Sequence, residues 1–107
     1  MADTNIESKK LGILVRDDKY LDQLISLTKA AHLKGVETRI FFTGKGVMLT
    51  QDPGFESLVG KARLMVCDVS FRALGLSGEV PGVGFKDFVT QAKNAEMIEE
   101  CDRYVVF

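Results

Sequence analysis

Two cysteines are the residues of this sequence whose chemistry depends most on their position. Cys67 ends an apolar run, residues 62–67, and immediately precedes a segment with the pattern of a short helix. At a helix start, a thiolate accepts hydrogen bonds from free backbone N–H groups and gains from the helix dipole, and both lower its pKa. The position indicates a nucleophilic thiol at Cys67, while an inert buried cysteine at the end of a core strand fits the same pattern.

Charged and polar residues near Cys67 are expected to tune this thiol. Asp68 disfavours a thiolate through its like charge, whereas Arg72 and Lys45 offset that charge. Ser70 belongs to the same segment after the strand. We therefore expect Asp68, Ser70, Arg72 and Lys45 to support Cys67.

Cys101 has the opposite setting, because it ends a predicted helix, residues 87–101, and precedes the last strand. The negative end of the helix dipole disfavours a thiolate there, so Cys101 is expected to pack rather than react. Strand lengths at ~3.3 Å per residue separate the two cysteines by roughly 15–20 Å. A disulfide needs Cα atoms within about 7 Å, so we expect two free thiols.

The remaining polar motifs fit ordinary structural roles. Gly44–Gly46 lacks the full spacing of a phosphate-binding loop and is predicted to be a turn. Asp17 and Asp18 are expected to cap a helix, and His32 lies in the last turn of that helix. The sequence contains no metal-ligand spacing and no Ser-His-Asp order, so neither a metal nor a cofactor is expected.

Apolar runs alternate with helical patterns along the chain. The predicted strands are residues 11–15, 36–42, 62–67 and 104–107, and residues 75–84 are irregular or hold one more short strand. The predicted helices cover residue 21 up to Gly35, 55–60, 68–74 and 87–101. The last of these carries an inward stripe of Phe88, Ala92, Ala95, Ile98 and Cys101. This alternation predicts an α/β fold, a three-layer α/β/α sandwich around a mostly parallel sheet of four to five strands, with the first and third strands adjacent.

Composition limits the classes of function. The 107 residues include 46% apolar types and carry a net charge of −1, which is typical of one globular domain and unlike most nucleic-acid binders. No run of ~18 apolar residues indicates a membrane span. We expect a polar N-terminal tail, residues 1–10, followed by a single domain, residues 11–107. The tail lacks the apolar region of a secretory signal, so a cytoplasmic protein is expected.

The sequence resembles the DsrE/DsrF family of small sulfur-relay proteins over most of its length. Four pieces carry the resemblance: residues 11–15, residues 40–42 leading to 46–47, Val66-Cys67 with 72–75 behind it, and residues 101–107. The resemblance implies a flavodoxin-like domain in which Cys67 accepts sulfane sulfur as a persulfide and passes it on. It also implies a trimer or hexamer, with sulfur donor and acceptor proteins as partners.

Two other classes of function stay open. The chain could be an assembly subunit in which Cys67 is a packing residue and the apolar stretch 71–83 is a contact. It could also bind a nucleotide or small anion near Gly44. A thiol peroxidase ranks below these, because no Pro, Thr or Ser has suitable spacing before Cys67. An accessible Cys67 favours sulfur chemistry, and a fully buried one favours packing.

Overall fold

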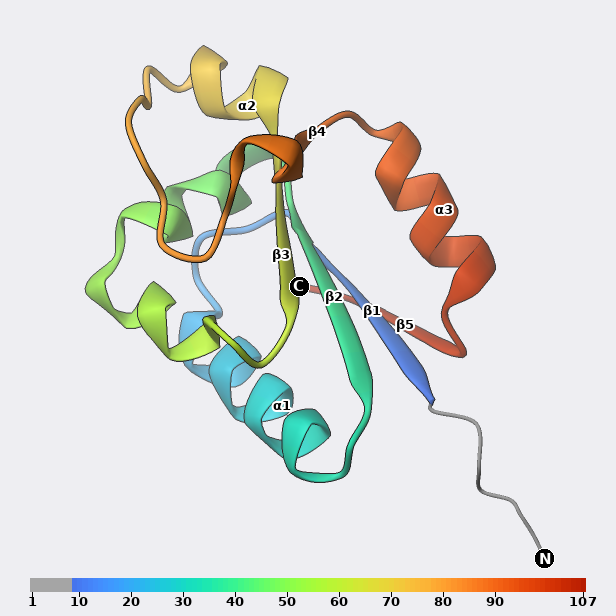
Figure 1. Ribbon diagram of the computed structural model, residues 1–107. Helices are drawn as coiled ribbons and strands as arrows, with labels where there is room; N and C mark the ends of the chain where they lie inside the picture. Colours follow the sequence, from blue (N-terminus) through green and yellow to red (C-terminus); the bar gives the residue numbers. More distant parts are fainter. Residues whose placement is uncertain (1–8) are drawn as a thin grey trace, which may run out of the picture.

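The computed structural model describes residues 9–107, and its centre is a five-stranded parallel sheet (Figure 1). The strands are β1 (Lys10–Val15), β2 (Glu37–Phe42), β3 (Arg63–Cys67), β4 (Phe88–Val89) and β5 (Arg103–Val106). The α-helices are α1 (Leu21–Leu33), α2 (Asp68–Ala73) and α3 (Ala92–Glu100). Three 3-10 helices are η1 (Gly44–Gln51), η2 (Pro53–Leu58) and η3 (Phe85–Asp87). The predicted α/β fold is confirmed.

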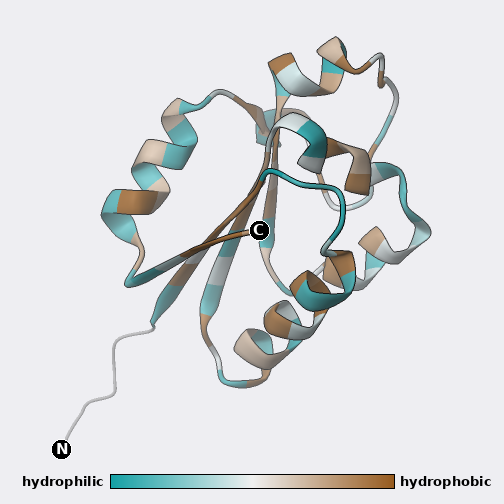
Figure 2. Cartoon of the chain, turned by 180° about the vertical axis from the view of Figure 1, so that it is seen from behind, coloured by the Kyte–Doolittle hydropathy of each residue, from teal (hydrophilic) through white to brown (hydrophobic). Residues whose placement is uncertain are grey.

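Helices cover both faces of the sheet, which gives three layers. Side chains alternate along each strand, so Val66 faces the larger core with α1 and η2, while Met65 and Cys67 face the smaller core under α3. In the smaller core, Met97 of α3 packs on Leu14, Phe41, Met65 and Cys67. Figure 2 shows hydrophobic residues along the central strands and a mixture of hydrophilic and hydrophobic residues along the helices on either side. Cys67 therefore belongs to the α3 face.

The strand order is β4-β3-β2-β1-β5, so the predicted adjacency of the first and third strands is wrong. β2 lies between β1 and β3, with Ile13 opposite Ile40 and Phe41 opposite Met65. Only the connection through α3 returns to the far edge of β1, where β5 pairs. An apolar run indicates that a strand is buried, but it does not indicate which strands pair with it. The strand order could therefore not be predicted from these runs.

The segment before α3 differs from the predicted helix 87–101. Phe88 and Val89 pair with β3 as the edge strand β4, and α3 begins only at Ala92. The inward side chain of α3 is Met97, whereas Ile98 is 54% exposed. The predicted stripe was wrong because it started from Phe88, a strand residue, and so set the wrong helical phase. Residues 75–84 contain an isolated bridge between Val80 and Val83 rather than a strand.

Two local predictions near the carboxyl end of β1 also need correction. Tyr20, not Asp17 or Asp18, is the N-terminal cap of α1, and its side chain makes no capping bond. The Asp17 carboxylate instead accepts from the Asp18 amide. Gly44–Gly46 is not a free turn but the start of η1. A Cβ on Gly46 would lie 2.2 Å from the Val15 carbonyl oxygen, so only glycine permits this contact between η1 and β1.

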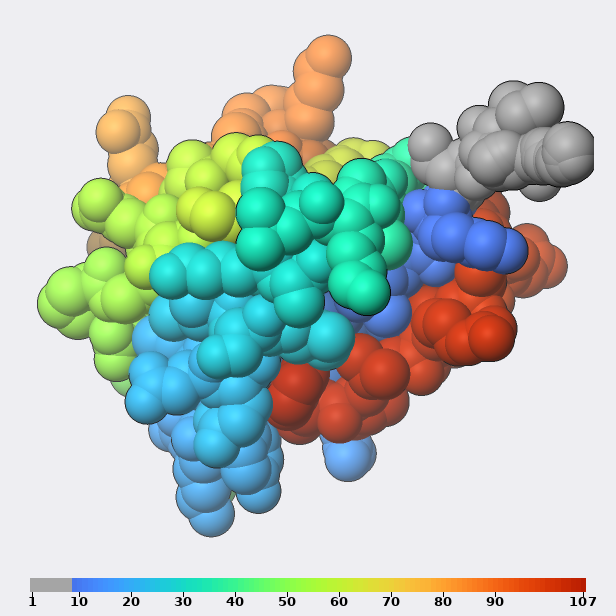
Figure 3. Space-filling view, turned by 90° about the horizontal axis from the view of Figure 1, so that it is seen from below, coloured from blue at the N-terminus to red at the C-terminus, as the bar shows by residue number. Residues whose placement is uncertain are grey.

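β1 is the first helix or strand in the described part of the chain. Lys10 is the first residue of β1, while residues 1–8 of the predicted tail lie outside the described part of the chain. Seen from below, α1 and the loop into β2 lie on one side of the start of β1, and the C-terminal segment lies on the other (Figure 3). Within residues 9–107, no helix combines the length and apolar character that a membrane crossing requires.

Candidate functional site

The carboxyl ends of three neighbouring strands bring together residues that are far apart in the sequence. β2, β3 and β4 are adjacent and parallel, so the residues that follow them meet at one edge of the sheet. Thr43 follows β2, Cys67 ends β3, and Gln91 is the second residue after β4. These three residues and Ser70 of α2 form the candidate site.

Cys67 is the N-terminal cap of α2, as the sequence predicts. Its backbone is extended (φ −68°, ψ 113°), and the first helical residue is Asp68. The Ser70 amide donates to the Cys67 Sγ at 3.5 Å, in the way that it would donate to the side-chain oxygen of a serine, threonine or aspartate cap. The cap therefore aims a backbone N–H group at the sulfur.

Hydroxyl and amide side chains surround the same sulfur. The Gln91 Nε2 lies 4.0 Å from the Cys67 Sγ and donates to the Thr43 Oγ1 at 2.9 Å. The Thr43 and Ser70 hydroxyl oxygens are 3.4 Å apart, and the Gly44 amide donates to the Ser70 Oγ at 3.0 Å. Because the Ser70 oxygen accepts from Gly44, its own proton is free to be donated. The network presents donors to Cys67 from three elements.

The opposite side of Cys67 is apolar and closed. The residue is 5% exposed and packs in the smaller core with Met65 and Met97, with Val89 against the same cluster. Gln91, in contrast, is an exposed residue at the start of α3. Apolar side chains thus lie on one side of the sulfur, and the Gln91 amide lies 4.0 Å away on the polar side.

These contacts shift the acidity of the thiol. Burial raises the pKa of Cys67, but hydrogen bonds from the Ser70 hydroxyl and amide, from Thr43 and from the Val69 amide lower it by more. The net pKa is below the ordinary value for cysteine. A lowered pKa increases the fraction of thiolate, which is the nucleophilic form.

Cys101 has a different environment, although it is also partly buried. It caps the carboxyl end of α3, and its Sγ would lie 3.1 Å from a Cβ on Gly12. Burial raises the pKa of Cys101, and the carboxylates of Glu37 and Glu100 add to this against the opposing charge of Arg39. Both cysteines are free, so the predicted absence of a disulfide between them is confirmed.

Of the predicted supporting residues, only Ser70 joins the candidate site. Asp68 and Arg72 pair with each other along α2, with the Arg72 Nε 3.2 Å from an Asp68 carboxylate oxygen. Lys45 is exposed on η1. The amides of Gly44 and Gly46 donate to Ser70 and Thr43, so these two groups are already bound within the protein.

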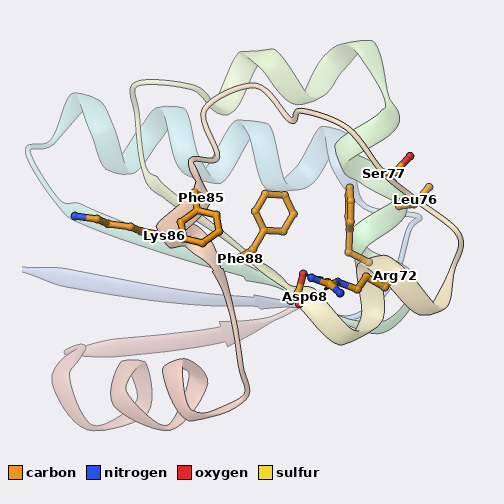
Figure 4. Close-up of a pocket in the computed structure, with 8 residues that line it drawn as sticks. Asp68, Arg72, Leu76, Ser77, Phe85, Lys86 and Phe88 are labelled. Atoms are coloured by element: carbon orange, nitrogen blue, oxygen red, sulfur yellow. Dashed lines mark hydrogen bonds and ion pairs between the residues drawn. The ribbon is translucent and has the colours of Figure 1, made fainter.

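Asp68 and Arg72 instead line an open groove of about 610 Å³ between α2 and η3. Figure 4 shows them together on α2, facing the rings of Phe85 and Phe88, while Lys86 extends away. Phe71 and Phe88 pack edge to face at the base, with ring centroids 5.1 Å apart. Phe85 is 94% exposed, which is unusual for so large an apolar side chain.

Sequence reasoning did not name Thr43 or Gln91 as site residues. Thr43 was visible as the first residue after a predicted strand. The sequence gives no sign of Gln91, because its pattern predicts a helix over Phe88–Val89 and so hides the strand end that positions Gln91. Among the described residues, no three His, Cys, Asp or Glu side chains gather in an arrangement that could hold a metal ion.

Comparison with known proteins agrees with this architecture. The model of the DsrE/DsrF-like family matches residues 9–107, which is nearly the whole chain and includes every strand and helix described above. None of the curated proteins matches the chain. With its five-stranded parallel sheet and a family match of this extent, the chain belongs to the DsrE/DsrF-like family.

Proposed function

We propose that this protein is a sulfur carrier that holds sulfane sulfur as a persulfide on Cys67. The Cys67 thiolate attacks the outer sulfur of a donor persulfide, R–S–SH. The S–S bond of the donor breaks, R–S⁻ leaves with the electron pair, and Cys67–S–SH forms. An acceptor thiolate then attacks the outer sulfur and releases the Cys67 thiolate. Neither transfer needs an external oxidant or reductant.

One observation carries this proposal, namely the position of the Cys67 Sγ. It accepts from the Ser70 amide as the cap of α2, within a network of Thr43, Ser70 and Gln91 donors. This environment lowers the pKa of Cys67, and each transfer uses Cys67 as the attacking or departing thiolate. Membership of the DsrE/DsrF-like family implies involvement in sulfur relay and agrees with this chemistry.

The test is intact mass spectrometry after incubation with a small-molecule persulfide donor. We expect a gain of about 32 Da per sulfur atom transferred in the wild type and in Cys101→Ala, and no gain in Cys67→Ala. An equal gain in both single variants would mean unspecific thiol chemistry. No gain in the wild type would leave a structural role for Cys67 as the better account.

The burial of Cys67 favours a second candidate, an assembly subunit in which this cysteine only packs. Members of the family commonly form oligomers, and we propose that this chain forms a trimer or hexamer. Phe85 at 94% exposed and Val69 at 71% exposed are apolar side chains that an interface would cover. Leu76, in contrast, packs against the larger core, so its replacement would report on folding as well.

Light scattering separates assembly from sulfur transfer. We expect wild-type protein at tens of micromolar to exceed the monomer mass, and Phe85→Ser to shift it toward the monomer. A wild-type monomer would overturn the assembly. If Phe85→Ser dissociates the oligomer without changing the gain of about 32 Da, assembly and sulfur transfer are separate properties.

A further inference from the structure

We infer that the side-chain amide of Gln91 binds the outer sulfur of the Cys67 persulfide and sets how long that sulfur is retained. This inference rests on the proposed function, and it assigns a role to a residue outside the cysteine, its strand and its helix. Gln91 reaches the site from the β4–α3 junction, on the far side of the sulfur from β2.

The geometry of the amide leads to this role. The Gln91 Nε2 is 4.0 Å from the Cys67 Sγ, at the long limit of a hydrogen bond to sulfur. An outer sulfur lies about 2.05 Å beyond Sγ. The 4.0 Å gap between Nε2 and Sγ is too short for the outer sulfur to lie directly between these two atoms. When the S–S bond points to one side of that gap, the outer sulfur comes within hydrogen-bond distance of the Gln91 Nε2. The amide is therefore placed better for the persulfide than for the bare thiolate.

The backbone donors to Cys67 are less suited to the outer sulfur. The Ser70 and Val69 amides belong to the backbone of α2 and are directed at Sγ itself. Met65, Met97 and Val89 fill the apolar side. The outer sulfur must therefore extend toward the polar side, where Gln91 lies.

Gln91 can also accommodate the extra atom without a change in the fold. It is exposed and precedes the first residue of α3, so its side chain can adjust slightly while the backbone stays in place. One N–H of its amide is held by the Thr43 hydroxyl at 2.9 Å, which leaves the second N–H for sulfur. Thr43 thus orients the amide, and Gln91 contacts the transferred atom.

The chemical consequence is slower loss of sulfur to small nucleophiles. A hydrogen bond stabilises the persulfide anion, Cys67–S–S⁻, and the amide covers the outer sulfur. An acceptor thiolate has to displace this contact before it attacks that atom and breaks the S–S bond. The departing Cys67 thiolate then accepts hydrogen bonds from the Ser70 donors.

The experiment compares the wild type with Gln91→Met, which keeps the size of the side chain but removes the donor. Gln23→Met is the matched control, because Gln23 is exposed on α1. Each protein is loaded with a persulfide donor, freed of excess donor, and mixed with cyanide, which removes the outer sulfur as thiocyanate. Intact mass then follows the loss of the added sulfur with time.

We expect Gln91→Met to lose its sulfur about 5-fold faster than the wild type, the effect of one hydrogen bond of about 1 kcal/mol. Gln23→Met should match the wild type. The pH midpoint for alkylation of unloaded Cys67 should hardly move in Gln91→Met, because the contact to Sγ is long. If Gln91 had only a structural role, its replacement would not change sulfur loss from the loaded protein while leaving alkylation of unloaded Cys67 unchanged.

Two results would overturn the inference while leaving the proposed function in place. One is equal sulfur retention in Gln91→Met and the wild type. The other is an equal effect on the unloaded thiol, which would assign Gln91 to the thiolate instead. If the wild type gains no sulfur on Cys67, the proposed function itself fails, and the inference fails with it.

Discussion

Cys67 and Cys101 occupy the same face of the sheet, yet their surroundings favour opposite charge states. Cys67 caps the amino end of α2 and receives hydrogen bonds from Ser70 and Thr43, so its pKa falls despite burial. Cys101 caps the carboxyl end of α3 beside two carboxylates, and its pKa rises. Cys67 is buried in the smaller core cluster, and Cys101 is partly buried against that cluster.

The comparison shows that burial alone does not decide whether a cysteine reacts. Burial raises the pKa of both thiols, because a charged sulfur loses solvation. The outcome is set by which end of a helix lies at the sulfur and by the donors that neighbouring strands supply. The parallel sheet contributes here, since the ends of β2 and β4 lie on either side of Cys67.

The largest expected effect is at Gly46, and Gly12 beside Cys101 provides the comparison. Gly46→Ala places a Cβ 2.2 Å from the Val15 carbonyl oxygen, a backbone clash that side-chain movement cannot relieve. We expect a loss of about 3 kcal/mol or more in the free energy of unfolding. Gly12→Ala meets the Cys101 Sγ at 3.1 Å, which can shift, so about 1 kcal/mol is expected.

Urea denaturation measures both changes. If Gly46→Ala cost no more than Gly12→Ala, the close packing of η1 on β1 would not hold, and neither would the position it gives Thr43.

The next largest effect is expected from Ser70→Ala, which should change the alkylation rate of Cys67 and not that of Cys101. The variant removes the hydroxyl that helps to lower the pKa of Cys67 and leaves the Ser70 backbone amide in place. At neutral pH we expect about 5-fold slower alkylation of Cys67, the effect of one hydrogen bond of about 1 kcal/mol. Peptide-resolved iodoacetamide labelling measures both cysteines in one sample.

The control for this variant is Ser77→Ala, an exposed position in the groove. It should leave both rates unchanged. Slower labelling of Cys101 in Ser70→Ala would indicate a general loss of structure rather than a local effect on Cys67.

A smaller change in the same direction is expected from Arg39→Met at the other cysteine. The Arg39 guanidinium pairs with Glu37 and Glu100, and its charge lowers the pKa of Cys101 against the effect of burial. Without it, Cys101 should be alkylated about 2-fold more slowly, since a partly exposed ion pair contributes less than about 1 kcal/mol. Unchanged labelling of Cys101 would show that Arg39 does not influence the pKa of this cysteine.

The smallest effect is a difference in how the two thiols link stability to pH. The lowered pKa of Cys67 means that its thiolate stabilises the folded state, and this contribution is lost as pH falls through the folded pKa. The raised pKa of Cys101 means that its contribution is present below about 9.0 and is lost as pH rises through the folded pKa.

Thermal unfolding at several pH values tests these signs. Relative to Cys67→Ala, the wild type should gain stability as pH rises toward 9.0, and relative to Cys101→Ala it should lose stability above 9.0. The same sign for both variants would contradict the difference between the two environments.

The sequence predicts well those parts of the fold whose signal is local. The runs 11–15 and 62–67 correspond to β1 and β3, and the polar residues after Cys67 correspond to the start of α2. Strand order depends on pairing between distant segments, and two residues are too few for a strand pattern, so β4 was missed. The candidate site was accordingly half predicted: Cys67 and Ser70 are local to one strand end, whereas Thr43 and Gln91 come from neighbouring ends.

The most direct test of the account is to find which cysteine of the wild type carries sulfur when the donor is limiting. Protein is mixed with less than one equivalent of a persulfide donor, blocked by alkylation and digested, and the added sulfur of about 32 Da is located by peptide mass spectrometry. The account predicts that the label lies on the peptide containing Cys67, with none above background on that of Cys101. Equal labelling, or a preference for Cys101, would contradict it.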